Sequence, residues 1–267
     1  MSLTPPRTGA GPGTAPTYGA ILLRGLLAGL IAGLLAGGFA YAFGESSVDA
    51  AIAIEEAAAH AEGAGADHHG EDALVSREGQ KGGLILATAL YGVAMGGLLA
   101  TAYTLLRRRL RTPDDTRAAL GLAAAALLGL VLVPFVKYPP NPPAVGDPAT
   151  INQRTISYVS MVVIGLVAVW AAVVASRSLR AGAPEWLRAV AAAGGFLVVV
   201  AVGYVLLPSI HEVPDTFPAA LLWDFRISSL GTQVTLWTGL GLTFAALVSR
   251  LSARSPAARE ETKSVAV

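Results

Sequence analysis

The chain has 267 residues, of which 54% are hydrophobic and 14% are charged, and its mean hydropathy is +0.58. Ordinary soluble domains carry roughly 25% charged residues, and a disordered chain needs low hydrophobicity and high charge, so both classes are excluded. The net charge of +1 gives no basic field for nucleic acid. The absence of cysteine excludes disulfides, thiolate catalysis and cysteine-type zinc sites.

Six apolar runs are each long enough to cross a bilayer as a helix, which takes about 20 residues. We therefore expect an all-α, polytopic membrane helix bundle with six transmembrane helices within residues 20–250, flanked by a disordered tail at 1–19 and a second tail at 251–267. The expected spans are 20–43, 83–106, 118–136, 155–176, 187–207 and 228–249.

Basic residues predict how these helices are oriented, because cytoplasmic loops carry an excess of lysine and arginine. With both termini in the cytoplasm, 14 of the 19 basic residues lie inside. In contrast, 13 of the 18 acids lie outside, and so do all four histidines. We expect a multi-pass protein of the bacterial inner membrane whose acidic, histidine-bearing outer face attracts cations. The alternative is ordinary topological charge bias. The five outer basic residues are Arg77, Lys81, Lys137, Arg154 and Arg226.

Glycines recur every fourth residue from Gly25 to Gly37 in the first span, and again at Gly92 and Gly96 in the second. Residues four apart share one helix face, and a face without Cβ atoms lets a neighbouring helix approach closely. This pattern predicts tight helix packing, with a role in permeation as the alternative.

The cores of the spans carry no charged residue that would mark a proton relay or a buried ion site. A translocated ion would meet only hydroxyl groups, one amide and backbone carbonyls. The polar candidates within the spans are Thr88, Tyr91, Ser157, Tyr158, Ser160, Thr232, Gln233 and Thr235.

The first expected outer segment, 44–82, combines a short helix at 48–61 with a flexible, acidic, histidine-bearing run. Asp49, Glu56 and His60, at positions i, i+7 and i+11, share one face of this helix. Carboxylate and imidazole groups bind cobalt, nickel, copper and zinc, although a solvated acidic loop has the same composition. The candidate ligands here are Glu45, Asp49, Glu56, His60, His68 and His69.

The outer segment 137–154 contains five prolines, and together with Pro134 they argue against a continuous helix. We expect a stiff, extended stretch that acts as a lid or a docking surface. Asp147 offers carboxylate oxygens, and Lys137 and Arg154 are placed to pair with acids of neighbouring segments.

The outer segment 208–227 supplies three more candidate ligands, His211, Glu212 and Asp224. It does not contain the zinc-protease motif, which needs a second histidine four residues after the first.

The sequence resembles the CbtA family, the proposed membrane subunit of a cobalt transporter. The matching stretches span nearly the whole chain and include FGESSVDAAIAIEEA (43–57), VPFVKYPPNPPAVGDPATI (133–151) and HEVPDTFPAALLWDFRISSLGTQ (211–233). The resemblance implies cobalt uptake associated with cobalamin synthesis, and a small single-span, histidine-rich partner, CbtB. It implies no particular transport residues. Family descriptions give five spans, whereas this sequence predicts six.

Two functions remain in competition. The first is a divalent-metal uptake subunit, with cobalt as the expected cargo and the lipid bilayer and a CbtB-like protein as partners. The second is a non-transporting membrane scaffold that docks a partner protein. We expect no enzyme activity, no resident cofactor and no nucleic-acid partner. The sequence does not decide whether the chain forms an oligomer. Metal identity cannot be read from oxygen and imidazole ligands, which serve several ions.

Overall fold

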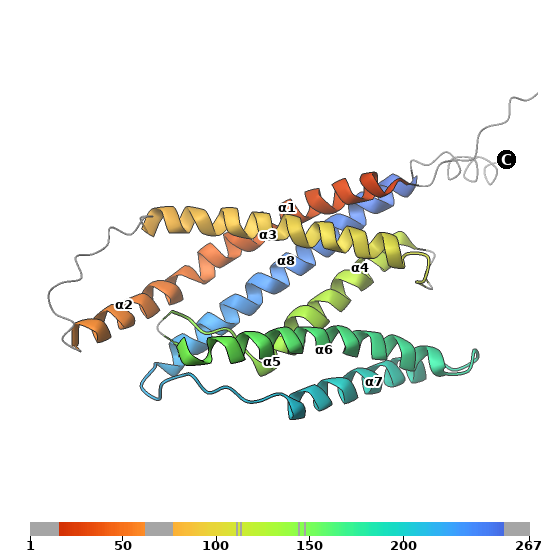
Figure 1. The fold of residues 1–267 in the computed structure, drawn as a ribbon. Coiled ribbons are helices and arrows are strands. Elements are labelled where there is room, and N and C mark those ends of the chain that lie inside the picture. The colour runs from red at the N-terminus through yellow and green to blue at the C-terminus, as the bar shows by residue number, and fades with distance from the viewer. Residues whose placement is uncertain are drawn as a thin grey trace, which may run out of the picture.

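The computed structural model describes residues 16–61, 77–110, 112, 114–143, 145–146 and 148–253. All regular elements in this part of the chain are helical (Figure 1). They are α1 (Tyr18–Phe43), α2 (Glu45–Ala61), α3 (Arg77–Leu106), α4 (Asp115–Ala126), the π-helical turn η1 (Leu127–Leu132), α5 (Val133–Lys137), the 3-10 turn η2 (Pro148–Thr150), α6 (Ile151–Ser178), α7 (Glu185–Leu206) and α8 (Ala219–Ala253).

Six helical stretches of the described chain are long and apolar enough to cross a membrane, which confirms the six predicted spans. The sixth differs most from its prediction, because α8 begins at Ala219 rather than near residue 228. Its first turns therefore occupy residues that were expected to form a loop, so Asp224 and Arg226 lie on a helix. The expected tails fall mostly on residues 1–15 and 254–267, outside the described residues.

Helices α1 and α3 pack antiparallel with their backbones in direct contact. A Cβ atom built on Gly25 or Gly29 would collide with the carbonyl oxygens of Gly96 and Gly92 on α3. Only glycine leaves this space, so the predicted close packing is confirmed.

Helix α8 returns to α1 and runs antiparallel to it. The Nε of Arg24 donates to the carbonyl oxygen of Leu247 (3.2 Å). At the other end of the two helices, the hydroxyl of Ser228 donates to the carbonyl oxygen of Phe43 (2.8 Å). The start of α1 and the end of α8 thus lie at the same end of the bundle (Figure 1). Helix α4 packs on the other side of α8.

Helix α7 packs mainly on α6, at the edge of the bundle (Figure 1). Its outer face is apolar and open: Val205 and Leu206 are 85% and 75% exposed. A helix that is apolar on its unpacked side is stable only when lipid covers that side. This arrangement is that of a multi-pass membrane protein.

Pro134 does not end its helix, in agreement with the predicted span 118–136, which contains it. The π-helical turn η1 comes first, and the N–H of Val133 donates to the carbonyl oxygen of Leu128, five residues back. Pro134 follows near the start of α5, where a missing N–H is tolerated, and the helix continues to Lys137. The non-helical stretch begins only at Tyr138.

The three connecting segments at the other end of the bundle pack together as a layer. Ala51 of α2, Val145 of the proline-rich segment and Phe217 before α8 form a small buried cluster. The hydroxyl of Tyr138 also donates to the carbonyl oxygen of Pro208 (2.6 Å). We call this the segment layer: α2, residues 138–143 and 145–146, and residues 208–218.

Candidate functional site

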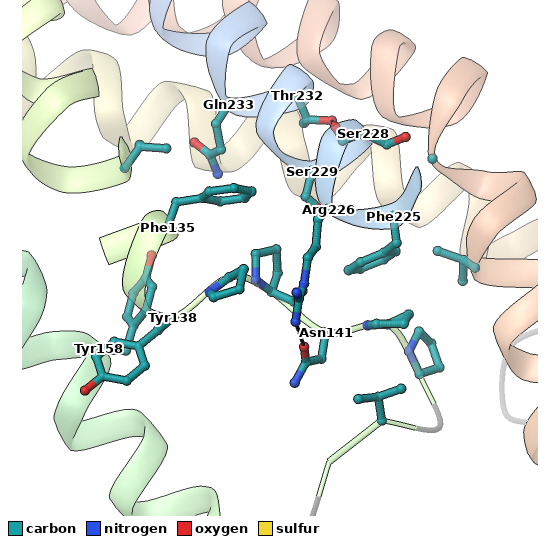
Figure 2. A pocket seen from close by; sticks show the side chains of 18 of the residues that line it. Phe135, Tyr138, Asn141, Tyr158, Phe225, Arg226, Ser228, Ser229, Thr232 and Gln233 are labelled. Carbon is teal, nitrogen blue, oxygen red and sulfur yellow. Dashed lines mark hydrogen bonds between the residues drawn. The ribbon is translucent and has the colours of Figure 1, made fainter. Parts of the chain in front are cut away.

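A cavity of about 1350 Å³ lies beneath the segment layer and extends between the spanning helices. The end of α1, the first half of α3, α5, the start of α6 and the first half of α8 supply its walls. The proline-rich segment crosses it (Figure 2). The fold thus brings the three connecting segments and the polar positions of the spans to one place.

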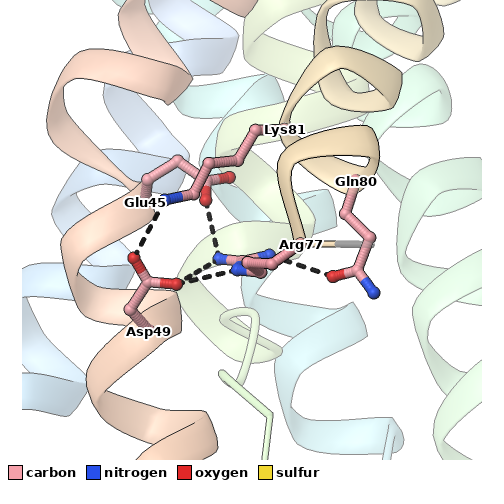
Figure 3. Close-up of polar contacts among 5 residues, drawn as sticks. All are labelled: Glu45, Asp49, Arg77, Gln80 and Lys81. Carbon is pink, nitrogen blue, oxygen red and sulfur yellow. Dashed lines mark hydrogen bonds and ion pairs between the residues drawn. The ribbon is translucent and has the colours of Figure 1, made fainter. Parts of the chain in front are cut away.

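A cluster of charges ties α2 to α3 beside this cavity (Figure 3). The Nη2 atom of Arg77 lies 2.7 Å from Glu45 Oε2 and 2.6 Å from Asp49 Oδ1. Lys81 Nζ lies 3.4 Å from the other oxygen of Asp49. The hydrogen bond from Arg77 is the largest cause that holds the pKa of Asp49 below its usual value. Glu45 also faces the cavity.

Glu212 is the most buried acid in the cavity wall, with a side chain only 2% exposed. The Nη1 atom of Arg154 lies 2.7 Å from its Oε2, and the hydroxyl of Thr150 donates to its Oε1. The predicted pairing of Arg154 with an acid of a neighbouring segment is confirmed. The pair joins the start of α6 to the segment that leads into α8.

Two further cations, Arg226 and Lys137, line the cavity and are held by neutral groups. Arg226 donates from Nη2 to Asn141 Oδ1 (2.9 Å, Figure 2) and from Nε to the carbonyl oxygen of Pro140 (3.3 Å). Lys137 Nζ donates to the carbonyl oxygen of Tyr204 (3.0 Å). Arg226 therefore fastens the proline-rich segment to α8.

The deeper wall of the cavity carries polar but uncharged side chains among apolar ones such as Leu84, Leu130 and Phe135. Five of the eight polar span positions predicted to meet a translocated ion line it: Thr88, Tyr91, Tyr158, Thr232 and Gln233. The Oε1 atom of Gln233 is buried and has no hydrogen-bond partner among the described residues. Figure 2 shows Gln233 on α8 facing Phe135 of α5. An acceptor of this kind is open to a donor or a cation brought by a ligand.

The structure brings only some of the predicted ligands to the cavity. His211, Glu212 and Glu45 line it, and Asp49 lies one step away, through Arg77. Asp224 is exposed and does not line it.

The remaining predicted ligands divide into two groups. Glu56 and His60 have exposed side chains on α2, away from the cavity. Asp147, His68 and His69 lie outside the described residues. Within the described chain, no three acidic or histidine side chains are grouped to hold a metal ion.

Sequence reasoning did not identify Arg226 as a cavity residue. It separated the last outer segment from the last span at residue 228, which left Arg226 on a loop. On the observed helix, Asp224 and Arg226 are two residues apart and point to different sides. The apolar residues between Ala219 and Trp223 were the available signal that α8 starts early.

In the comparison with protein families, the chain matches a family described as probable cobalt transporter subunit (CbtA), over residues 18–249. The comparison with curated proteins gave no match, and neither did the comparison with solved structures. The family match covers five of the spanning stretches in full, the sixth up to residue 249, and every residue that lines the cavity.

Proposed function

The chain belongs to the CbtA family of probable cobalt transporter subunits, and from this premise we propose that it is the membrane subunit through which divalent metal, cobalt in particular, enters the cell. The observation that carries the proposal is the cavity, which leads from the segment layer to Gln233 between the spans. A scaffold that only docks a partner has no need of such a cavity.

Both termini are proposed to lie in the cytoplasm and the cavity to open outward, on the basis of the lysine and arginine distribution. The membrane potential then favours inward movement by about 2.3 kcal/mol per charge per 100 mV, so a divalent ion has a driving force without ATP. We propose transport without covalent catalysis, together with a small single-span, histidine-rich CbtB-like partner.

His211, Glu212 and Glu45 are the proposed capture residues, because they line the cavity wall. Imidazole and carboxylate groups are ligands for divalent ions of this kind. The other predicted ligands stay predictions: Asp49, Glu56, His60, Asp224, Asp147, His68 and His69.

Radiocobalt uptake tests the proposal in cells that lack their other cobalt importers. The chain is supplied alone, with the single-span partner, or not at all. We expect uptake above background that excess unlabelled cobalt competes more strongly than zinc does. Absence of uptake in every arm, with the protein present in the membrane and co-purifying with a partner, would favour the scaffold function.

Variants of the cavity wall make the same assay specific to this site. Gln233→Leu removes the unpartnered oxygen and should lower uptake at least severalfold. Thr235→Val is the matched control, because Thr235 lies on the same helix but does not line the cavity. Equal uptake by the two variants would place the route elsewhere.

The capture residues are tested by removing His211, Glu212 and Glu45 together, which should lower uptake. Asp224→Asn alone serves as the comparison and should leave uptake unchanged, because that side chain does not line the cavity. Normal uptake by a well-expressed triple variant would reject the capture site.

A further inference from the structure

We propose that the cavity receives its metal as an anionic chelate, and that carboxylate oxygens of the chelating molecule bind Arg226 and Lys137. This inference rests on the proposed function, since it names the substrate class of the same cavity.

The charges of the cavity wall favour an anion over a bare cation. Among the described residues, two carboxylates line the wall, and each already has a cation: Glu45 lies 2.7 Å from Arg77, and Glu212 lies 2.7 Å from Arg154. The other charged side chains that the structure describes in the wall, Lys137 and Arg226, are positive. A bare divalent ion could bind the proposed capture residues Glu45 and Glu212 only after it displaced their arginines. A chelate brings its own ligands for the metal and leaves both ion pairs intact.

Arg226 is the first of the two remaining cations. Its contacts are to Asn141 Oδ1 and to the carbonyl oxygen of Pro140, both of them neutral acceptors. Both bonds leave from Nε and Nη2, whereas a guanidinium has five N–H donors in a planar fork. The donors of Nη1 make no bond to another described residue, and such a fork matches the two oxygens of a carboxylate.

Lys137 is the second of the two remaining cations. Its Nζ donates to the carbonyl oxygen of Tyr204 and lies over the rings of Tyr138 and Tyr204, at 5.6 and 5.8 Å from their centres. Among the described residues, no carboxylate forms an ion pair with Lys137 or Arg226. Both side chains are half-buried in the cavity wall, where the carboxylates of an anionic ligand can pair with them.

The size of the cavity agrees with a chelate. A metal ion with six waters occupies roughly 200 Å³, at about 30 Å³ for each water. The cavity holds about 1350 Å³, which also exceeds the 300–1,000 Å³ typical of small-molecule pockets. A polycarboxylate that surrounds a metal ion fits this space and leaves room for water.

Equilibrium dialysis of the purified full-length chain in neutral detergent tests the inference. The probes are the cobalt–citrate complex, citrate alone and cobalt chloride. We expect the wild type to bind the cobalt–citrate complex more tightly than citrate alone or cobalt chloride. Arg226→Gln should bind the complex at least about tenfold more weakly than the wild type, which is the usual effect of losing a hydrogen bond to a charged group. Arg226→Lys should keep part of the affinity.

Arg117→Gln is the control, because Arg117 is 82% exposed and lies outside the cavity. Each variant must first elute as a single species with wild-type helix content. Tighter binding of cobalt chloride than of the complex, or equal binding by Arg226→Gln and the wild type, would overturn the inference. Equal binding of citrate alone, or displacement of the complex by an anionic lipid such as phosphatidylglycerol, would show a general oxyanion site and overturn it as well.

Uptake at a fixed free-cobalt concentration separates this inference from the proposed function. Uptake that rises with the concentration of the complex supports both. Uptake that follows free cobalt alone keeps the proposed function and rejects the chelate. Binding of the complex by the purified chain, without uptake in cells, supports the anionic site and rejects the proposed function.

Discussion

At the scale of single residues, the pair formed by Arg154 and Glu212 has the clearest energetic consequence. Glu212 is almost fully buried, whereas Arg154 is 41% exposed. Removing one partner of such a pair costs more than the pair contributes, because the other charge stays buried without compensation. Arg154→Met should therefore lower stability by about 1–3 kcal/mol, and restoring neutrality with Glu212→Gln should recover part of the loss.

Thermal melts followed by tryptophan fluorescence measure this effect in the single and double variants. The expected order of melting temperatures is wild type, then the double variant, then Arg154→Met. A double variant that melts below Arg154→Met would mean that the arginine stabilises the chain by some route other than its charge.

Asp49 makes a pH-dependent contribution at the same scale. Its pKa in the folded chain is lowered, chiefly by the hydrogen bond from Arg77, so its ionised form stabilises the fold. That contribution is complete above the unfolded pKa of about 3.9 and is lost as the pH falls through the lower folded value. The gap in melting temperature between the wild type and Asp49→Asn should therefore be larger at pH 7 than at pH 3. A gap that is constant with pH would rule out the charge as its cause.

At the scale of the helices, the glycine contact between α1 and α3 gives a prediction with an internal control. Gly29→Ala should destabilise the chain by more than 1 kcal/mol, because its Cβ meets the backbone of Gly92. Gly38→Ala, on the same helix, has nothing within 4 Å of its Cβ and should be neutral or stabilising. Melting temperatures of the two variants in one detergent check the difference. If Gly29→Ala melted at the same temperature as Gly38→Ala, α1 and α3 could separate without loss of stability.

The helices also show how far sequence reasoning reaches. Apolar length alone located six spans, and the four-residue glycine spacing predicted the α1–α3 contact, because both are local patterns. The π-helical turn before Pro134 was not predicted, because such a turn has no signal in composition. The early start of α8 was missed because Asp224 and Arg226 resemble loop residues until the fold places them.

The candidate site was only partly predictable for a related reason. Sequence identified the polar span positions and the outer acids, and five of the former do line the cavity. Which acids are already paired depends on contacts such as Arg154 with Glu212, 58 residues apart. Such distant pairs follow from the packing of helices and not from spacing along the chain.

At the scale of the whole molecule, the orientation in the membrane is open to direct measurement. The chain has no cysteine, so each introduced cysteine is a unique label. Thr17→Cys and Leu251→Cys lie at one end of the bundle and Asp215→Cys lies at the other. A membrane-impermeant maleimide on intact cells should label Asp215→Cys alone. Labelling of the Thr17 and Leu251 variants instead would reverse the proposed orientation.

The return of α8 to α1 has a consequence for how the protein is made. Arg24 and Leu247, which contact each other in the folded chain, are 223 residues apart. At about 5–20 residues per second, a ribosome needs roughly 10–45 seconds to synthesise that interval. During this time the face of α1 that α8 will cover has no partner from its own C-terminal helix. Assembly of the bundle must therefore wait for the last helix, whereas α6 and α7, adjacent in the chain, can pair as soon as both are inserted.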